Sequence, residues 1–307
     1  MTTSAATVPF NRDAILGVAF ALLAAVGFSG KAILVKLAYL YHVDAITLLA
    51  LRMVFAVPFF IGVAVWSRLR HAAPLNRHDW MLVLGLGLIG YYLSSLFDFL
   101  GLQYITAGLE RLILFLYPTM TVILTAVLYK RPVSGKVRAA MALSSAGIAL
   151  VFLHDVGIKQ GGSVVLGSTL VFCSTLSYSS YLVGAGHAIK RIGATRFTAY
   201  AMIVASAACL LQFVVLRPMS ALELPLQVYE LSIAMALFST VLPVFLLAYA
   251  IRRIGSDITS LIGSIGPVST IAMAYVFLHE SLSLLQIFGS SLVLIGVLMV
   301  SLNSKRA

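Results

Sequence analysis

The sequence predicts an all-α integral membrane protein of ten transmembrane helices, arranged as two inverted repeats of five helices. Three observations support this fold class. The 307 residues are 61% hydrophobic and 10% charged, with a mean hydropathy of +1.04. Uncharged runs of about 18 residues or more recur along the chain, as expected for membrane-spanning helices. Basic residues gather in alternate loops, and one unit of sequence recurs 149 residues later.

The apolar runs define the individual spans, whose ends are known to within about two to four residues. In chain order they cover residues 14–38, 45–66, 79–100, 103–128, 136–153, 164–187, 195–216, 229–251, 255–278 and 283–302. Connections such as Gly101-Leu102 and Gly255-Ser256 are very short. Consecutive spans are therefore expected to be antiparallel neighbours.

The loop charges predict the orientation of the chain. Lys31, Lys36, Arg52 and Arg111 lie in or at the edge of spans, and only Lys159 and Arg217 fall on one side of the membrane. The other fifteen basic residues fall on the opposite side: Arg12, Arg68, Arg70, Arg77, Lys130, Arg131, Lys136, Arg138, Lys190, Arg191, Arg196, Arg252, Arg253, Lys305 and Arg306. Because basic residues accumulate in cytoplasmic loops, both termini are expected to face the cytoplasm.

The recurring unit divides the chain into two repeats, at residues 14–153 and 164–302, with cytoplasmic segments at 1–13 and 303–307. At the offset of 149 residues, paired prolines and paired glycines coincide. Five is an odd number of spans, so the second repeat must enter the membrane upside down relative to the first. Inverted repeats are typical of secondary transporters. A duplication retained in a receptor or scaffold is the alternative.

Five charged residues lie inside spans of the first repeat, where insertion costs roughly 2.5–3.5 kcal/mol each. They are Lys31, Arg52, Asp98, Glu110 and Arg111. Their places along the outward-running and inward-running spans put all five in the extracytoplasmic half of the membrane. We expect this group to line an outer vestibule, to hold an outward gate shut through ion pairs, or to bind a carboxylate.

Each of these residues also has a plainer structural interpretation. Lys31 is able to snorkel to the interface along its own stem, and Asp98 is close enough to its helix end to be hydrated. Glu110 and Arg111 are adjacent, so they point about 100° apart on a helix and at least one must face the bundle. Arg52 is deeper, and we expect it to pair with Asp98 or Glu110.

Pro118 and Pro267 lie near the middle of their spans, at matching places in the two repeats. A proline frees the carbonyl four residues earlier, here those of Leu114 and Gly263. Interrupted helices at corresponding positions point to a binding site at the membrane midplane. The further candidate binding or gating residues are therefore Tyr117, Pro118, Gly263, Ser264, Gly266 and Pro267. Small residues in the ninth span are equally compatible with close helix packing.

Several classes of function find no support. The net charge of +11 is explained by the cytoplasmic loops, so it does not indicate a nucleic-acid partner. Cys173 and Cys209 lie in apolar segments outside any CxxC or Cys/His pattern, so neither a disulfide nor a metal site is expected. The chain lacks HExxH, GxSxG and P-loop motifs, so no enzyme activity, ATP drive or cofactor is expected.

The stretch PVSTIAMAYVFLHESLSLLQIFGSSLVLIGVLMV in the second repeat resembles the EamA family of the drug/metabolite transporter superfamily. The likeness rests on Pro267, an acidic turn at Glu280, Gln286, Gly289 and Gly296. The first repeat has the same proline and glycine. It departs from the family with Lys130-Arg131-Pro132, where Gly-Glu is frequent, and with Glu110-Arg111, where small residues are commoner. The likeness covers nearly the whole chain, but its motifs are structural and say little about the substrate.

The resemblance implies an inner-membrane (plasma-membrane) carrier with a central cavity that works by alternating access. Members of the family often export amino acids and related metabolites. The related small multidrug-resistance pumps couple protons through a glutamate of the first helix, whereas the first span here has no mid-membrane carboxylate. Proton coupling would therefore have to use Asp98 or Glu110.

These observations favour a secondary transporter that exports small polar metabolites. Uptake or facilitated diffusion by the same fold stays open, because the direction of flux cannot be derived from the sequence. A membrane sensor or scaffold that transports nothing is the third alternative. The expected partners are a small-molecule substrate and the lipid bilayer, with the proton as candidate coupling ion. The oligomeric state is left open, and a monomer is compatible with the sequence.

Overall fold

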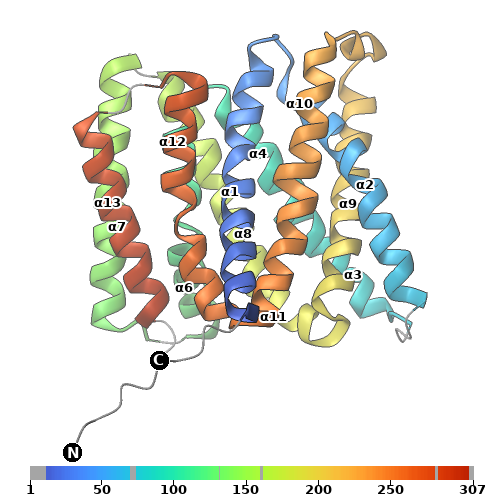
Figure 1. Ribbon diagram of the computed structural model, residues 1–307, viewed down its shortest axis with the longest axis horizontal. Coiled ribbons are helices and arrows are strands. Elements are labelled where there is room, and N and C mark those ends of the chain that lie inside the picture. The colour runs from blue at the N-terminus through green and yellow to red at the C-terminus, as the bar shows by residue number, and fades with distance from the viewer. Residues whose placement is uncertain (1–11, 70–73, 131, 160–161, 281–282, 304–307) are drawn as a thin grey trace, which may run out of the picture.

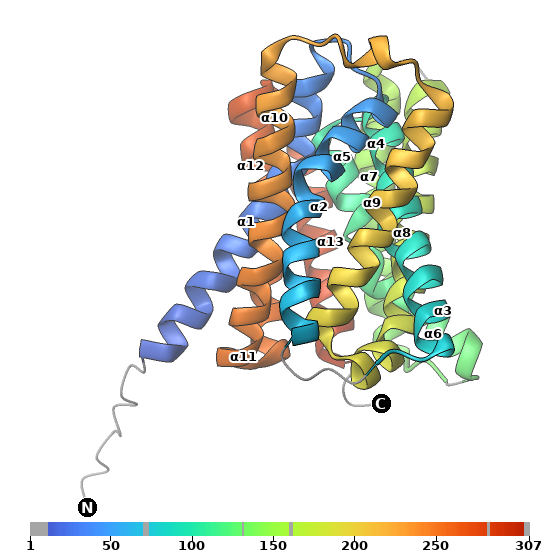
Figure 2. The same cartoon turned by 90° about the vertical axis from the view of Figure 1, so that its right-hand side faces the viewer.

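The computed structural model describes residues 12–69, 74–130, 132–159, 162–280 and 283–303, and every element among them is helical. The segments 1–11 and 304–307, which the sequence assigns to the cytoplasm, lie outside this description, as do Arg70 and Arg131. The helices run side by side as one bundle (Figure 1). α1 begins and α13 ends at one end of the bundle, which we name the terminal face (Figure 1, Figure 2). The opposite end is named the distal face.

The first half of the chain contributes three continuous helices and two interrupted segments. Its elements are α1 (Arg12–Tyr39), α2 (Ala45–Leu69), α3 (Arg77–Gly87), the π-helical turn η1 (Leu88–Leu93), α4 (Ser94–Leu102), α5 (Ala107–Leu114), α6 (Tyr117–Tyr129) and α7 (Gly135–Lys159). The expected third span thus consists of α3, η1 and α4, and the expected fourth span consists of α5 and α6.

The second half follows the same order. Its elements are α8 (Gly162–Ile192), α9 (Ala194–Leu216), the short 3₁₀ turn η2 (Met219–Leu222), α10 (Leu226–Ala236), the π-helical turn η3 (Leu237–Val241), α11 (Leu242–Gly263), α12 (Gly266–Leu278) and α13 (Leu284–Asn303). The expected boundary between the eighth and ninth spans falls within α11, because the chain stays helical through this turn.

Contacts with α1 reveal where the chain reverses inside α11. Ile254 lies against Gly17, near the start of α1, whereas Pro243 lies against Gly27 further along. Beyond the turn, Gly266 lies against Ser29, whose Oγ donates a hydrogen bond to the Gly266 carbonyl at 2.9 Å. The chain therefore descends along α1 to Ile254 and returns along it as far as Gly266.

Seven helical segments of the described chain are long and apolar enough to cross a membrane. They are Asp13–Tyr39, Ala45–Leu69, Arg77–Leu102, Ala107–Tyr129, Gly135–His154, Ala194–Leu216 and Leu226–Ile254. Two more apolar helices, Gly266–Leu278 and Leu284–Met299, are shorter. α8, with 31 residues, is not among these segments. It is long enough, but it is less apolar, and its buried side is rich in hydroxyls, including Ser174, Thr175 and Ser179. The chain is thus a multi-span membrane protein, and the count of ten spans stays a prediction.

The duplication is visible in irregular features that recur 149 residues apart. The π-helical turns begin at Leu88 and Leu237. The helix breaks follow Leu114 in the first half and Gly263 in the second. α6 and α12 end on non-glycine residues in the left-handed region, at Lys130 (φ 52°) and His279 (φ 53°). Because a left-handed non-glycine residue is uncommon, agreement at this level identifies two copies of one structural unit.

α7 and α13, the last helices of the two halves, pack tightly through glycines. A β-carbon added to Gly147 would lie 2.5 Å from the Gly289 carbonyl oxygen, and one added to Gly296 would lie 2.7 Å from that of Ala140. The pairing of residues 147 with 289 and 140 with 296 makes the two helices antiparallel. Close packing through small residues is how helices associate where lipid removes the hydrophobic driving force.

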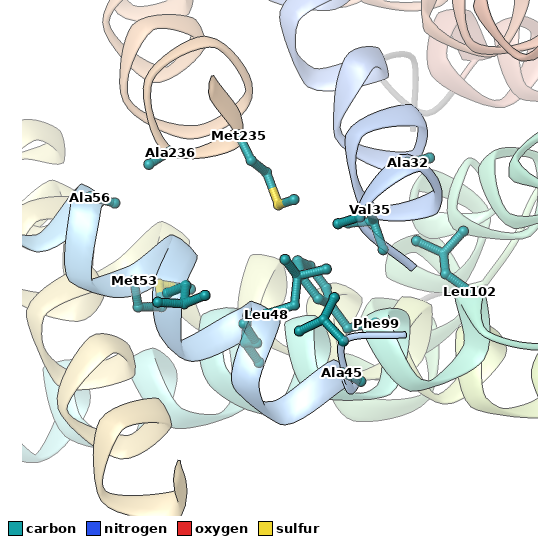
Figure 3. Packing of buried hydrophobic residues seen from close by; sticks show 14 of the residues in the cluster. Ala32, Val35, Ala45, Leu48, Met53, Ala56, Phe99, Leu102, Met235 and Ala236 are labelled. Carbon is teal, nitrogen blue, oxygen red and sulfur yellow. The ribbon is translucent and has the colours of Figure 1, made fainter. Parts of the chain in front are cut away.

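The largest apolar cluster joins α1, α2, α4, α9 and α10. Figure 3 shows Met235 of α10 directed toward Val35, Leu48 and Phe99, which come from three other helices. Phe99 is fully buried, and its sequence neighbour Asp98 is 3% exposed. The apolar cluster therefore reaches up to the charged residues that the sequence singles out.

Candidate functional site

Three of the predicted charged residues meet inside the bundle. Lys31 Nζ of α1 lies 3.0 Å from Glu110 Oε1 of α5 and forms an ion pair with Asp98 Oδ2 of α4. The exposed fraction of the Glu110 side chain is 0%, and neither of its carboxylate oxygens has a hydrogen-bond partner of good geometry. We name Lys31, Asp98 and Glu110 the charged triad. One ammonium group therefore serves two buried carboxylates.

The chain turn between α4 and α5 brings the two carboxylates together. Thr106 caps α5, and its Oγ1 accepts a hydrogen bond from Leu109 N at 3.2 Å. Asp98 lies in the last turns of α4 and Glu110 in the first turns of α5, so both lie close to this turn, at a similar depth in the bundle. A lysine on the neighbouring α1 is then within reach of both.

Arg52 does not make the ion pair that we expected with Asp98 or Glu110. Its Nε donates to Thr240 Oγ1 at 2.9 Å, and its guanidinium carbon lies 5.5 Å from the centre of the Phe99 ring. Thr240 belongs to the π-helical turn η3, which offers a hydroxyl to α2. Lys31 already contacts both carboxylates, and Arg52 contacts a hydroxyl and the face of an aromatic ring instead. Its Nη1 is buried without a hydrogen-bond partner.

Arg111 extends from α5 to the start of α12, and its Cα lies about 100° around the helix from that of Glu110. A β-carbon added to Gly266 would lie 2.6 Å from Arg111 Nη2 and 3.4 Å from Ser29 Oγ. The guanidinium therefore rests against bare backbone at the start of α12. Its Nε is buried and has no hydrogen-bond partner.

Pro118 and Pro267 lie directly after the helix breaks inside their predicted spans, in the first turns of α6 and α12. Proline is tolerated in the first turn of a helix because no backbone donor is needed there. Gly263 ends α11, and Ser264 follows it in the break. The expected open carbonyls therefore belong to complete helix breaks, one in each half.

Hydroxyls from the first helix of the opposite half reach each break. Ser179 Oγ of α8 donates to the Tyr117 carbonyl at 3.1 Å, and Thr175 Oγ1 of the same helix donates to the Ile113 carbonyl at 3.1 Å. At the other break, Ser29 Oγ of α1 donates to the Gly266 carbonyl. None of these three hydroxyl residues was predicted from the sequence, although the serine-rich composition of α8 was a usable signal for Thr175 and Ser179.

Tyr117 belongs to a row of aromatic rings between α6 and α8. Its ring centre is 5.7 Å from that of Tyr178, which stacks on Tyr181 at 5.6 Å. The hydroxyl oxygens of Tyr181 and Tyr91 are 2.9 Å apart. Tyr117 is thus placed beside the first helix break, with its ring fixed by neighbouring tyrosines.

Glu280 joins the two halves at the distal face, a contact that the sequence did not predict. Its Oε1 accepts from Ala107 N at 3.0 Å and its Oε2 from Gly108 N at 3.5 Å. It therefore caps the start of α5 from the end of α12. A small pocket of about 20 Å³ lies beside it, lined in part by Leu112 and Ser290. This volume suits about one water molecule, so the pocket is too small for a metabolite.

Asp44 forms a second link between the halves at the distal face. Its Oδ1 lies 3.0 Å from Arg217 Nε, and it caps α2 by accepting from Ile46 N at 3.0 Å. Partial burial acts to raise the pKa of Asp44. Hydrogen bonds from Thr47 and Arg217 outweigh this effect, so the pKa lies below its ordinary value.

Replacing Asp44 by asparagine keeps the helix cap and removes the charge. A carboxylate whose pKa is lower in the folded state stabilises that state above its ordinary pKa, and the stabilisation disappears as the pH falls through the lowered pKa. Because the Asp44 side chain is 34% exposed, we expect a difference of at most about 1 kcal/mol near neutral pH. Thermal unfolding of both proteins from pH 7 to pH 3 measures it, and a difference independent of pH would contradict the assignment.

An all-helical membrane bundle with a duplicated pattern of helix breaks and buried charges is typical of the transporter class. The chain matches the EamA-like transporter family over residues 15–153 and again over residues 165–302. It belongs to this family, as the sequence predicts.

Named relatives agree with this assignment. The uncharacterized transporter YcbK of Bacillus subtilis (strain 168) is 30% identical over 290 residues, which cover 91% of this chain and 90% of that protein. The uncharacterized transporter sll1319 of Synechocystis sp. is 23% identical, over 94% of this chain and 93% of its own. A solved protein crystal structure superposes with a TM-score of 0.63 at 17% identity, covering 94% and 98% of the two chains. That likeness shows the fold alone.

Proposed function

We propose that this EamA-family protein is a secondary transporter that exports small polar metabolites, such as amino acids or related compounds, by alternating access. The observation that carries the proposal is the charged triad, which is buried between α1, α4 and α5 beside a duplicated pair of helix breaks. Ionisable groups inside a membrane are costly, and they mark substrate and ion pathways. The triad residues, Arg52, Arg111 and the residues of the breaks are the proposed binding or gating residues.

The proposal includes ten spans in two inverted repeats, residues 14–153 and 164–302, in the inner (plasma) membrane. Two contacts support the inversion. α7 and α13, which occupy equivalent places in the two halves, are antiparallel. Glu280, just after α12, touches Ala107 at the start of α5, so the end of the ninth span lies beside the start of the equivalent fourth span and the two spans run in opposite directions. The terminal face, where α1 begins and α13 ends, is the proposed cytoplasmic side.

Contacts between the halves at both faces support alternating access. Asp44 and Arg217 pair at the distal face, and Asp79 pairs with Arg191 at 2.6 Å near the terminal face. A transporter of this type must release one set of contacts while it keeps the other. The proton is the proposed coupling ion, and Glu110 or Asp98 is its proposed carrier, because both lie inside the membrane next to Lys31.

Flux through reconstituted vesicles tests the proposal. The purified protein is reconstituted into vesicles, which are preloaded with unlabelled compounds from a panel of amino acids and related metabolites. Uptake of the matching radiolabelled compound from outside is then followed with and without a pH gradient. We expect counterflow of one chemical class, which Glu110→Gln abolishes while the protein still inserts. Response to the gradient distinguishes a proton-coupled exporter from a facilitator. Absence of flux for the whole panel, with Glu110→Gln and Arg111→Ala altering only partner binding, would instead indicate a sensor or scaffold.

A further inference from the structure

Among the three cations that lie inside the spans of the first repeat, Arg111 is the one for which the described part of the chain supplies no acceptor. Lys31 contacts both carboxylates of the triad, and Arg52 donates to Thr240. Arg111 donates no hydrogen bond to any described residue, and its Nε is buried without a partner. Arg111 is nevertheless partly exposed, unlike Glu110 beside it. A guanidinium that is desolvated in part and left without an acceptor is costly unless an anion binds there.

The charged residues inside the spans of the first repeat, Arg111 among them, carry a net positive charge that one anion would neutralise. Lys31, Arg52 and Arg111 are cationic, and Asp98 and Glu110 are anionic, so the five groups together carry one positive charge in their ordinary ionisation states. Glu110 is directed to Lys31, 3.0 Å away, and not to Arg111. A monoanion would neutralise the group, whereas a dianionic phosphate would leave it one charge negative.

The backbone next to Arg111 is also suited to an anion. α12 begins at Gly266 beside the guanidinium, and no side chain caps its first turn. The amino end of a helix carries a partial positive charge and favours anions. Ser29 Oγ is directed to the carbonyls of Ala25 and Gly266, at 2.7 and 2.9 Å. It therefore holds the start of α12 in place and leaves the guanidinium free to bind a ligand.

Gly266 is needed for this arrangement. Any β-carbon there would lie 2.6 Å from Arg111 Nη2 and would displace the guanidinium. The corresponding place in the first half is occupied by Tyr117, and the residue corresponding to Arg111 is Ser260. The arrangement of an arginine against a bare helix start therefore occurs in one of the two copies only.

We infer that Arg111 and the amino end of α12 form a binding site for the carboxylate group of a small ligand. This inference deepens the proposed function, on which it rests, by naming the substrate class: small molecules that carry one free carboxylate. Arginine suits this role because its planar fork of donors matches the two oxygens of a carboxylate. The triad, in which Lys31 contacts both carboxylates, then lies beside the substrate site.

A binding measurement tests the site without requiring transport. Detergent-solubilised protein is titrated with acetate and benzoate, and with benzamide as the neutral analogue of benzoate, while thermal unfolding is followed. We expect both carboxylates to raise the melting temperature and benzamide to leave it unchanged. Absence of a shift with either carboxylate, or an equal shift with benzamide, would overturn the inference.

Variants assign the binding to Arg111. We expect Arg111→Gln to abolish the shift, Arg111→Lys to weaken benzoate affinity about tenfold, and Gly266→Ala to weaken it while all charges are kept. Arg138→Gln, on the exposed surface of α7, is the matched control and should retain the full shift. Should Arg111→Gln fail to fold, Arg111→Lys and Gly266→Ala still decide the question, because unchanged affinity in both contradicts the site.

The outcomes separate this inference from the proposed function. Vesicles that show no flux, from a protein whose benzoate binding depends on Arg111, would refute transport and leave the anion site standing. Flux of compounds without a carboxylate, unaffected by Arg111→Lys, would refute the site and leave transport standing.

Discussion

Replacing Lys31 by methionine is expected to destabilise the protein by about 3–5 kcal/mol, because it leaves uncompensated charge buried. Lys31 Nζ is the cation that contacts both Asp98 and Glu110, whose side chains are 4% and 0% exposed. Methionine keeps the length and the apolar stem of lysine but removes the ammonium group. Thermal unfolding of the solubilised protein measures the loss of stability.

A double replacement separates the charge effect from lost packing. Adding Glu110→Gln to Lys31→Met removes one of the two uncompensated carboxylates, so we expect it to restore part of the stability. Lys136→Met, at an exposed position near the start of α7, serves as the matched control and should change stability by less than about 0.5 kcal/mol. Equal losses in the single and double variants would show that the triad is not held together by charge.

The sequence was sufficient to predict the helical membrane fold, the family and the location of the helix breaks. These features depend on local chemistry, since apolar runs define helices and a proline limits where a helix can continue. The paired prolines Pro118 and Pro267 therefore identified the duplicated irregularity, and each lies in the first turn of the helix that follows the break.

The partners of the charged residues were less predictable, because they depend on contacts between distant segments. Arg52 binds Thr240, 188 residues further on, through a π-helical turn that no local pattern in the sequence indicates. The sequence likewise indicated that Lys31, Asp98 and Glu110 lie at similar depth, but not that one ammonium would contact both carboxylates. The depth of a residue in the membrane follows from its position along a span. The neighbours that its side chain contacts depend instead on how the helices pack.

The left-handed turn at His279 explains why the partner of Glu280 was not predicted. α12 ends there at φ 53°, which directs the following residue back toward the bundle. Glu280 then accepts from the backbone of Ala107 and Gly108, 173 and 172 residues away. An acidic residue in a family turn was visible in the sequence, but its partner on the other half was not.

Replacing Glu280 by alanine is expected to open the distal face of the bundle. The change removes the cap on α5 that comes from α12, and lost helix caps cost about 0.5–2 kcal/mol. If the distal contacts close one of two alternating states, a change of about 1.4 kcal/mol shifts their populations tenfold. The replacement leaves every other residue unchanged, so a shift in the populations would be attributable to the contact of Glu280 with α5.

Cysteine labelling measures the opening. Ser290 lines the small pocket next to Glu280 and is 6% exposed, so Ser290→Cys places a thiol behind the contact. In a background of Cys173→Ser and Cys209→Ala, we expect Glu280→Ala to raise the rate of maleimide labelling at position 290 about tenfold. Glu223→Ala, which removes an exposed carboxylate between α9 and α10, should leave the rate unchanged. An unaltered rate in Glu280→Ala would mean that the contact between α12 and α5 does not close the distal face, and the alternating movement would then have to rely on the Asp44–Arg217 pair.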